Sequence, residues 1–324
     1  MILINKLFAS LIEKPRALRM SFPKILRIIR VHIVIGGFLA FSLGALLAIA
    51  AGGTFNPALF ALYYAIVFFG DLSTHFSNDY FDVEVDKHAG HRKFFSGSNI
   101  LVNHAELRPL SRSVSILLLA FSISLAAVAV LFVGAPIELL IIAVGANFLG
   151  WAYSAPPLRL TSRGFGELAI AVATGFAIPA VGYLSVRGQL DPFFVFLTFP
   201  FMMYGLVLSL SLEAPDREID LKGGRKNIGV RKGERTVFSL ILAMVLSATS
   251  AFVFYAWQTT VTAIDVWVVA LFSVAPLMAG LLGFVKVLQK RDVNRYSTWN
   301  IVSLYFFNMF TIAYLLLIVT NHVG

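Results

Sequence analysis

Carboxylates gather in two short stretches of a chain that otherwise carries few charges. Residues 78–86 read Asn-Asp-Tyr-Phe-Asp-Val-Glu-Val-Asp and residues 213–220 read Glu-Ala-Pro-Asp-Arg-Glu-Ile-Asp, and together they hold eight of the 17 acidic residues. The i, i+3, i+7 spacing within each stretch would place three carboxylates on one helix face. These are Asp79, Asp82 and Asp86, and then Glu213, Asp216 and Asp220. Like charges gather around a cation, so the spacing predicts two half-sites for hard divalent cations.

A glycine-containing loop rich in Lys and Arg follows each acidic stretch. The clustered cations are Lys87, Arg92 and Lys93 after the first stretch and Lys222, Arg225 and Lys226 after the second. Arg beside a carboxylate-bound metal offers a phosphate ester a bidentate fork, and Lys offers a point charge. Arg30 and Arg163 are two further possible anion contacts. The alternative is that these cations only lie in solvated loops or anchor helix ends in lipid headgroups.

Polar residues also continue from the acidic stretches into apolar sequence. Asp71 and His75 extend the stripe of the first stretch, and an ionisable group at that depth is costly, so it predicts a functional site. For Asp71, lining a substrate cavity and making a structural hydrogen bond both remain open. Asn147 and Tyr153 stand near the end of another apolar run and are candidates for the same cavity, although Tyr153 also fits a belt of interfacial aromatics.

The elements that position these residues are membrane-spanning helices. Of the 324 residues, 58% are hydrophobic and only 13% are charged, whereas soluble domains have about 25% charged residues. Runs of about 17–25 apolar residues predict an all-α polytopic bundle. The nine predicted spans are 31–51, 57–77, 113–133, 136–153, 165–185, 192–212, 236–257, 264–285 and 299–320.

The basic residues predict how this bundle is oriented. Positive charge is retained in short cytoplasmic loops, and nine spans place 25 of the 26 Lys and Arg on one side, with only Arg187 on the other. We therefore expect a multi-pass protein of the cell membrane with a cytoplasmic N-terminus, cytoplasmic active-site loops and an external C-terminus. Residues 1–30 would form a basic, amphipathic segment, and residues 31–324 a single nine-helix domain.

Composition also bounds the partners and the chemistry. The net charge of +9 belongs to the cytoplasmic face, where it suits anionic lipids and anionic substrates and argues against nucleic acid. The chain has no cysteine, which excludes disulfides, thiolate nucleophiles and Cys-ligated metal centres.

The motifs resemble those of the UbiA superfamily of intramembrane prenyltransferases. Its signature Asn-Asp-x-x-Asp-x-x-x-Asp and its second motif Asp-x-x-x-Asp are matched by Asn78, Asp79, Asp82, Asp86, Asp216 and Asp220. Residues 153–160 and 164–167 are similar to the family's loop between spans 4 and 5. Two departures are Glu213 before the second motif, where a kink at Pro215 is expected, and Asn227, where the family usually has Thr.

This resemblance implies transfer of an isoprenyl group from a prenyl diphosphate to a lipophilic acceptor within the membrane. The five Asp residues of the motifs would hold Mg²⁺, two ions bridged by diphosphate, and Asn78 with the basic residues would bind that diphosphate. Asp79, Asp82, Asp216, Asp220 and Asp71 would be catalytic. The apolar cavity would be rich in aromatic side chains, with Tyr153, Asn147 and His75 in its lining.

The acceptor and two other classes of function remain as alternatives. The loop after the first motif looks most like the MenA-like branch, which implies quinone biosynthesis and an aromatic quinone precursor as acceptor. A non-aromatic acceptor such as a glycerol-phosphate ether is the alternative within the family. A cation-coupled transporter would need its carboxylates near mid-span, and a purely structural scaffold would not need paired motifs.

Overall fold

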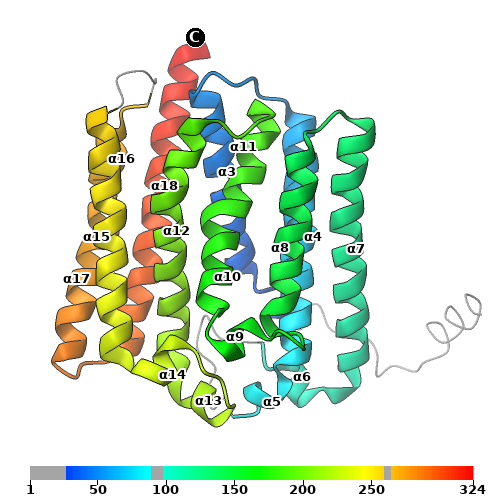
Figure 1. Cartoon of the computed structure of the whole chain (residues 1–324), viewed down its shortest axis with the longest axis vertical. Helices are drawn as coiled ribbons and strands as arrows, with labels where there is room; N and C mark the ends of the chain where they lie inside the picture. The colour runs from blue at the N-terminus through cyan, green and yellow to red at the C-terminus, as the bar shows by residue number, and fades with distance from the viewer. Residues whose placement is uncertain (1–26, 89–97, 259–263, 324) are drawn as a thin grey trace, which may run out of the picture.

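A computed structural model describes residues 27–88, 98–258 and 264–323 of the chain, and the regular elements in these ranges are helices (Figure 1). The long ones are α3 (Val31–Ala50), α4 (Pro57–Phe81), α7 (Arg108–Phe132), α8 (Ile137–Ser154), α11 (Ile178–Arg187), α12 (Pro192–Glu213), α15 (Glu234–Gln258), α17 (Val274–Leu288) and α18 (Val293–Val323). The short ones are α5 (Val83–Asp86), α6 (Ile100–Asn103), α9 (Leu160–Arg163), α10 (Gly166–Val172), α13 (Arg217–Lys222), α14 (Ile228–Lys232) and α16 (Val266–Phe272).

Nine helical segments of the described chain are long and apolar enough to cross a membrane. This confirms the predicted polytopic all-α bundle, and most span boundaries lie within a few residues of the predicted ones. The sixth and third spans depart furthest, because the sixth continues to Lys222 and the third begins at Ala105. The fifth span is one continuous membrane segment in which a π-helical turn, Ala173–Ala177, joins α10 to α11.

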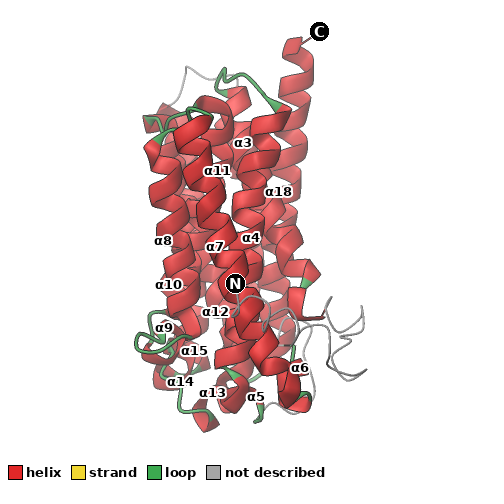
Figure 2. Cartoon of the chain, turned by 90° about the vertical axis from the view of Figure 1, so that its right-hand side faces the viewer, coloured by secondary structure: helices red, strands yellow, loops and turns green. Residues whose placement is uncertain are grey.

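Both acidic stretches lie at the same end of the bundle. The short helices α5, α6, α9, α13 and α14 gather there, and the C-terminal end of α18 lies at the opposite end (Figures 1 and 2). Helices α4 and α12 each run into one acidic stretch. The bundle therefore brings the motifs together although they are far apart in sequence.

The prediction that each acidic stretch forms one continuous helix face is wrong. Helix α4 ends at Phe81, and Asp82 has φ −92° and ψ 3° before α5 begins. In the second stretch a 3₁₀ turn, Ala214–Asp216, follows α12, and Asp216 has φ −97° and ψ 7°. Proline favours this second break, as expected for Pro215. Both aspartates occupy the sparsely allowed region between helix and strand, where active-site residues often lie.

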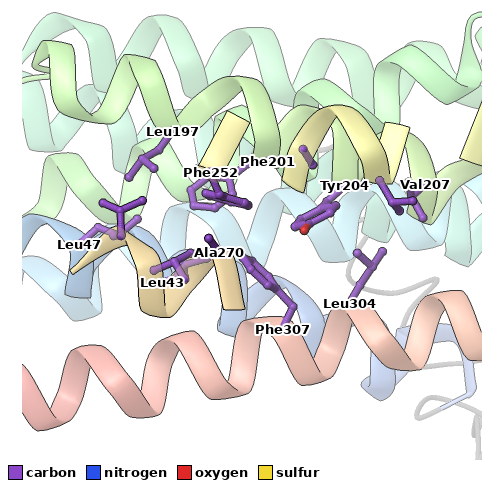
Figure 3. Close-up of a cluster of buried hydrophobic side chains, with 14 of the residues drawn as sticks. Leu43, Leu47, Leu197, Phe201, Tyr204, Val207, Phe252, Ala270, Leu304 and Phe307 are labelled. Atoms are coloured by element: carbon purple, nitrogen blue, oxygen red, sulfur yellow. The ribbon is translucent and has the colours of Figure 1, made fainter. Parts of the chain in front are cut away.

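Close helix packing holds the scaffold around these motifs. A Cβ atom on Gly44 of α3 would lie 2.0 Å from the Pro179 carbonyl oxygen of α11, and one on Gly182 would lie 2.0 Å from the Phe41 carbonyl oxygen. Small residues of this kind let membrane helices approach closely. Aromatic rings from α12, α15 and α18 fill a buried cluster that includes Tyr204, Phe252 and Phe307 and that also contains residues of α3 and α11 (Figure 3).

Candidate active site

A cavity of about 330 Å³ runs from the acidic motifs into the bundle. Its polar lining combines carboxylates of both motifs with two arginines and with side chains deeper in α4 and α8. The predicted site residues in this lining are Arg30, Asp71, His75, Asn78, Asp82, Asp86, Asn147, Tyr153, Asp216, Asp220 and Arg225. The fold thus brings most of the predicted set to one place.

The first motif is held by partners from several elements. Asp79 is buried and accepts hydrogen bonds from the Arg30 guanidinium and the Ser98 hydroxyl. Asp82 Oδ2 accepts a hydrogen bond from Ser154 Oγ at 2.8 Å and lies 2.7 Å from the Arg225 guanidinium. This motif is therefore fixed by side chains from the residue before α3, the end of α8 and the loop after α13.

The second motif is fixed mainly through Asp220. Its Oδ1 lies 3.0 Å from Arg225, and its Oδ2 accepts a 2.7 Å hydrogen bond from the Asn227 side chain. Asn227 also caps α14 by accepting from the Val230 amide at 2.9 Å, the usual role of an N-cap residue. Asn227, where the family usually has Thr, therefore ties the basic loop to the motif.

The electrostatics of the site favour binding of a cation. Burial, together with the neighbouring Asp82 and Asp79 carboxylates, raises the pKa of Asp86 to about 7. Burial opposes the charge of Arg225, but its ion pairs with Asp82 and Asp220 outweigh this and raise the pKa of that guanidinium. A cation near the carboxylates would relieve their repulsion.

The donor set fits Mg²⁺ in its chemistry. Asp82, Asp86, Asp216 and Asp220 all line the cavity, and carboxylate oxygens are what this ion prefers. In the described residues no three His, Asp or Glu side chains converge closely enough to hold a metal ion in this arrangement. The Arg225 guanidinium instead lies between Asp82 and Asp220.

Several predicted anion contacts lie elsewhere. Lys87 pairs with Glu84 at 2.7 Å, and the Arg163 guanidinium donates to the Pro157 carbonyl at 2.8 Å. Lys222 and Lys226 are exposed, and neither lines the cavity. Arg92 and Lys93 lie outside the described residues. A role for these residues in diphosphate binding remains a prediction.

Three residues of the site were not predicted to contribute. Ser98 and Ser154 hold the aspartates of the first motif, and Asn227 holds the second. Glu213, which the spacing places with Asp216 and Asp220, lines the cavity. A signal existed for Ser154, which follows Tyr153 in the loop that resembles the family. Ser98 belongs to the loop 96–98 that looks like the MenA-like branch, but this likeness did not indicate its partner Asp79, which is 19 residues away.

The expectation of an aromatic-rich lining is wrong. Among the described residues that line the cavity, Tyr153 is the only Phe, Tyr or Trp. Aliphatic side chains make the walls, including Ile66, Ile142, Ala146, Ile170, Ile178, Val181 and Leu208. Many of the aromatic residues either face outward, as Phe196 and Phe199 do, or fill the buried cluster of Figure 3.

Comparison with known proteins agrees with this architecture. The structure of a UbiA homologue from Archaeoglobus fulgidus bound to DMAPP and Mg²⁺ has a TM-score of 0.68 at 19% identity, covering 92% of this chain and 99% of that one. The apo structure of a UbiA homologue from Aeropyrum pernix K1 has a TM-score of 0.61 at 12% identity, covering 86% of this chain and 98% of that one.

Sequence comparison is more specific. The 1,4-dihydroxy-2-naphthoate octaprenyltransferase of Bacillus subtilis (strain 168) is 24% identical over 139 residues, which are 43% of this chain and 44% of that protein. The match thus spans less than half of the curated relative. The model of the UbiA prenyltransferase family matches residues 38–312, most of the described bundle with both acidic motifs. The chain belongs to the UbiA prenyltransferase family.

Proposed function

We propose that this protein catalyses Mg²⁺-dependent transfer of an isoprenyl group from a prenyl diphosphate to a lipophilic acceptor within the membrane. The observation that carries the proposal is the convergence of both acidic motifs on one apolar cavity, with Arg225 in contact with Asp82 of the first motif and Asp220 of the second. A diphosphate with a hydrocarbon tail needs this combination of a charged mouth and an apolar interior.

The two ends of the cavity would do different work. Mg²⁺ would be held by the buried Asp79 and by the four aspartates that line the cavity, Asp82, Asp86, Asp216 and Asp220. When bound, this ion stabilises a leaving diphosphate. Two ions bridged by one diphosphate fit five aspartates divided between two motifs. Arg30 and Arg225 line the same mouth and supply further positive charge for the diphosphate.

The interior of the cavity would shield the reacting carbon. When the bond between the allylic carbon and the diphosphate oxygen breaks, positive charge develops on the isoprenyl group, and water would capture it. The aliphatic walls formed by residues such as Ile142, Ile170 and Val181 exclude water and accommodate the hydrocarbon. Tyr153 is the one Phe, Tyr or Trp side chain of the described lining, and its ring could face the developing charge.

For the acceptor, we propose an aromatic quinone precursor of the dihydroxynaphthoate type. Support comes from the loop after the first motif and from the likeness to a 1,4-dihydroxy-2-naphthoate octaprenyltransferase. A second candidate is a glycerol-phosphate ether, because a structure described as digeranylgeranylglyceryl phosphate synthase has a TM-score of 0.61 to this chain. That likeness, at 17% identity, concerns the fold alone.

The test is a transfer assay with the purified protein. Geranylgeranyl or farnesyl diphosphate is incubated with Mg²⁺ and, separately, with 1,4-dihydroxy-2-naphthoate, 4-hydroxybenzoate and glycerol-phosphate ether acceptors, and products are identified by mass spectrometry. We expect prenylated naphthoate that disappears when EDTA removes the metal. Product from the glycerol-phosphate ether alone would overturn the acceptor assignment, and no product together with no Mg²⁺-dependent binding of prenyl diphosphate would overturn the proposed reaction.

A further inference from the structure

A polar cluster lies in the cavity wall, away from the acidic motifs. Asp71, Thr74 and His75 come from α4 and Asn147 from α8, and all four line the cavity. Along the helix, Asp71 lies about 12 Å and His75 about 6 Å before Asp79, because they precede it by eight and four residues. Thr74 already donates to the Gly70 carbonyl, but a hydrocarbon tail would leave the Asp71 carboxylate and Asn147 Oδ1 without a donor, whereas a small molecule with hydroxyl groups would satisfy them.

The His75 ring shows how protons are arranged in this cluster. Its Nδ1 lies 2.5 Å from the Ile29 carbonyl oxygen, and a carbonyl only accepts, so Nδ1 carries a hydrogen. Its Nε2 lies 3.4 Å from Asp71 Oδ1, so a proton delivered to the Asp71 carboxylate can be shared with this nitrogen. The pair can therefore accept one proton from a bound molecule.

Asn147 presents a hydrogen-bond acceptor that has no partner. Its Nδ2 donates to the Ala143 carbonyl at 2.8 Å and to Ser122 Oγ at 3.0 Å. The Ala143 carbonyl cannot donate, so it fixes the orientation of the amide. Asn147 Oδ1 is buried and has no hydrogen-bond partner in the described residues, and the side chain as a whole is 6% exposed. A Cβ atom on Gly70 would lie 3.1 Å from this oxygen, so a side chain at that position would crowd it.

Other charged and titratable groups surround the pair. The hydroxyls of Tyr64 in α4 and Tyr305 in α18 lie within the field of the Asp71 carboxylate. Arg30 and Asp79 act on the His75 ring from the side of the first motif. Tyr305 donates to the His32 carbonyl at 2.9 Å. The Asp71 side chain is 21% exposed, and Asp71 lines the cavity, so a cavity-bound molecule can reach its carboxylate.

We propose that Asp71, His75 and Asn147 form the subsite for the prenyl acceptor, with Asn147 Oδ1 accepting a hydrogen bond from one acceptor hydroxyl and the Asp71–His75 pair receiving the proton of another. This inference rests on the proposed prenyl transfer and names the chemistry of its second substrate. The ligand class is a hydroxylated aromatic ring, because two separate hydroxyl donors would satisfy the two acceptor groups of the subsite.

The step balances without a further reactant. Electrons of the acceptor ring form the bond to the allylic carbon, and the pair of electrons in the carbon–oxygen bond leaves with the diphosphate. The hydroxyl conjugated with the attacking carbon becomes a carbonyl and gives its proton to the Asp71 carboxylate. The Asp71–His75 pair then returns that proton to water after the products leave.

The experiment compares three variants of the full-length protein. Asp71→Asn keeps the size and a hydrogen bond to His75 but removes the proton acceptor. Asn147→Leu removes the unpaired oxygen. Asn300→Leu is the matched control, because Asn300 is a buried membrane amide of α18 that does not line the cavity. Each variant is assayed for Mg²⁺-dependent binding of farnesyl diphosphate and for kcat and KM with 1,4-dihydroxy-2-naphthoate across pH.

We expect all three variants to bind farnesyl diphosphate as the unchanged protein does. Asp71→Asn should lower kcat by on the order of 10², as for loss of a general base, and the loss should shrink at alkaline pH, where the acceptor hydroxyl ionises in solution. Asn147→Leu should mainly raise KM for the acceptor, and Asn300→Leu should change neither constant.

Contrary results have separate meanings. Normal kcat and KM in both subsite variants, or failure of either to bind farnesyl diphosphate, would overturn the subsite, since the second result would place these residues in donor binding or folding. If the unchanged protein binds farnesyl diphosphate but prenylates no hydroxylated ring, the subsite proposal also fails. If it binds no prenyl diphosphate, the proposed function itself has failed.

Discussion

Asp82 and Asp216 occupy equivalent places in the two motifs. Asp82 directly follows α4, and Asp216 ends the 3₁₀ turn that follows α12. The two have nearly the same backbone dihedrals, and each lines the same cavity. Of the carboxylates that the i, i+3, i+7 spacing singled out, Asp82, Asp86, Asp216 and Asp220 line one cavity. The spacing did not predict their geometry, because the helix that would carry them breaks at the central aspartate. A broken helix aims the carboxylates across the cavity mouth, whereas an unbroken one would spread them along its face.

Charge removal at these two positions is the first prediction. Asp82→Asn or Asp216→Asn keeps the side-chain size, so the protein should insert and fold, but Mg²⁺-dependent turnover should fall by on the order of 10² or more. The double variant should be little worse than either single one, because groups that act as a unit are not additive. Turnover with purified protein measures this.

Glu84→Gln and Glu218→Gln are the matched controls. Both residues are exposed, and Glu84 pairs only with Lys87 in the described contacts, so turnover should stay near normal. A pattern in which the Glu variants lose activity and the Asp variants keep it would show that the wrong carboxylates were assigned to the metal.

The second prediction concerns Ser154, which donates a hydrogen bond to the first motif. Ser154→Ala removes the 2.8 Å hydrogen bond to Asp82, an interaction worth about 1.5–3 kcal/mol when one partner is charged. Without it the carboxylate is less fixed, so the dissociation constant for Mg²⁺, measured by titration calorimetry with prenyl diphosphate present, should rise roughly tenfold. Ser247→Ala, which removes an exposed hydroxyl that bonds only within its own helix, should leave it unchanged.

At the scale of elements, helix positions were predictable and their contacts were not. Runs of apolar residues predicted α8 to within a residue or two, because the bilayer thickness sets a helix length. The pairing of α3 with α11 depends on Gly44 and Gly182 meeting carbonyl oxygens of the other helix. Glycines are common in membrane helices, so nothing in the sequence distinguishes these two from Gly145, which meets no atom within 4 Å of an added Cβ.

This contrast gives a prediction about stability. Gly182→Ala should force α3 and α11 apart and lower the free energy of unfolding by about 1–3 kcal/mol, the usual cost of overpacking. Gly145→Ala adds the same methyl group where there is room and should be neutral or slightly stabilising. Thermal denaturation in detergent measures both. Equal melting temperatures for the two variants would contradict the close contact between α3 and α11.

For the whole molecule, the residues that the sequence could not place are those whose partners come from distant segments. The spacing of Asp82 and Asp86 recurs in Asp216 and Asp220, and this recurrence predicted a shared site because a bound cation explains it. The pairing of Arg30 with Asp79, by contrast, joins the approach to α3 with the end of α4 across 49 residues. Such pairings depend on how the helices pack, and a list of basic residues does not encode that.

The charge distribution gives the last prediction, which concerns the membrane sides. The acidic motifs and most basic loops lie at one end of the bundle, and the C-terminal end of α18 lies at the other (Figure 2). Because positive charge stays in the cytoplasm, the motif end should be cytoplasmic.

The chain lacks cysteine, so a single introduced cysteine reports which side of the membrane its position lies on. Lys222→Cys and Gln189→Cys suit this test, since both residues are exposed and lie at opposite ends. In intact cells an impermeant thiol reagent should label the cysteine at 189 and should reach the one at 222 only after the membrane is opened. Labelling of position 222 in intact cells, with protection of 189, would invert the topology and place the prenyl diphosphate site outside the cell, where the positive-inside rule does not allow it.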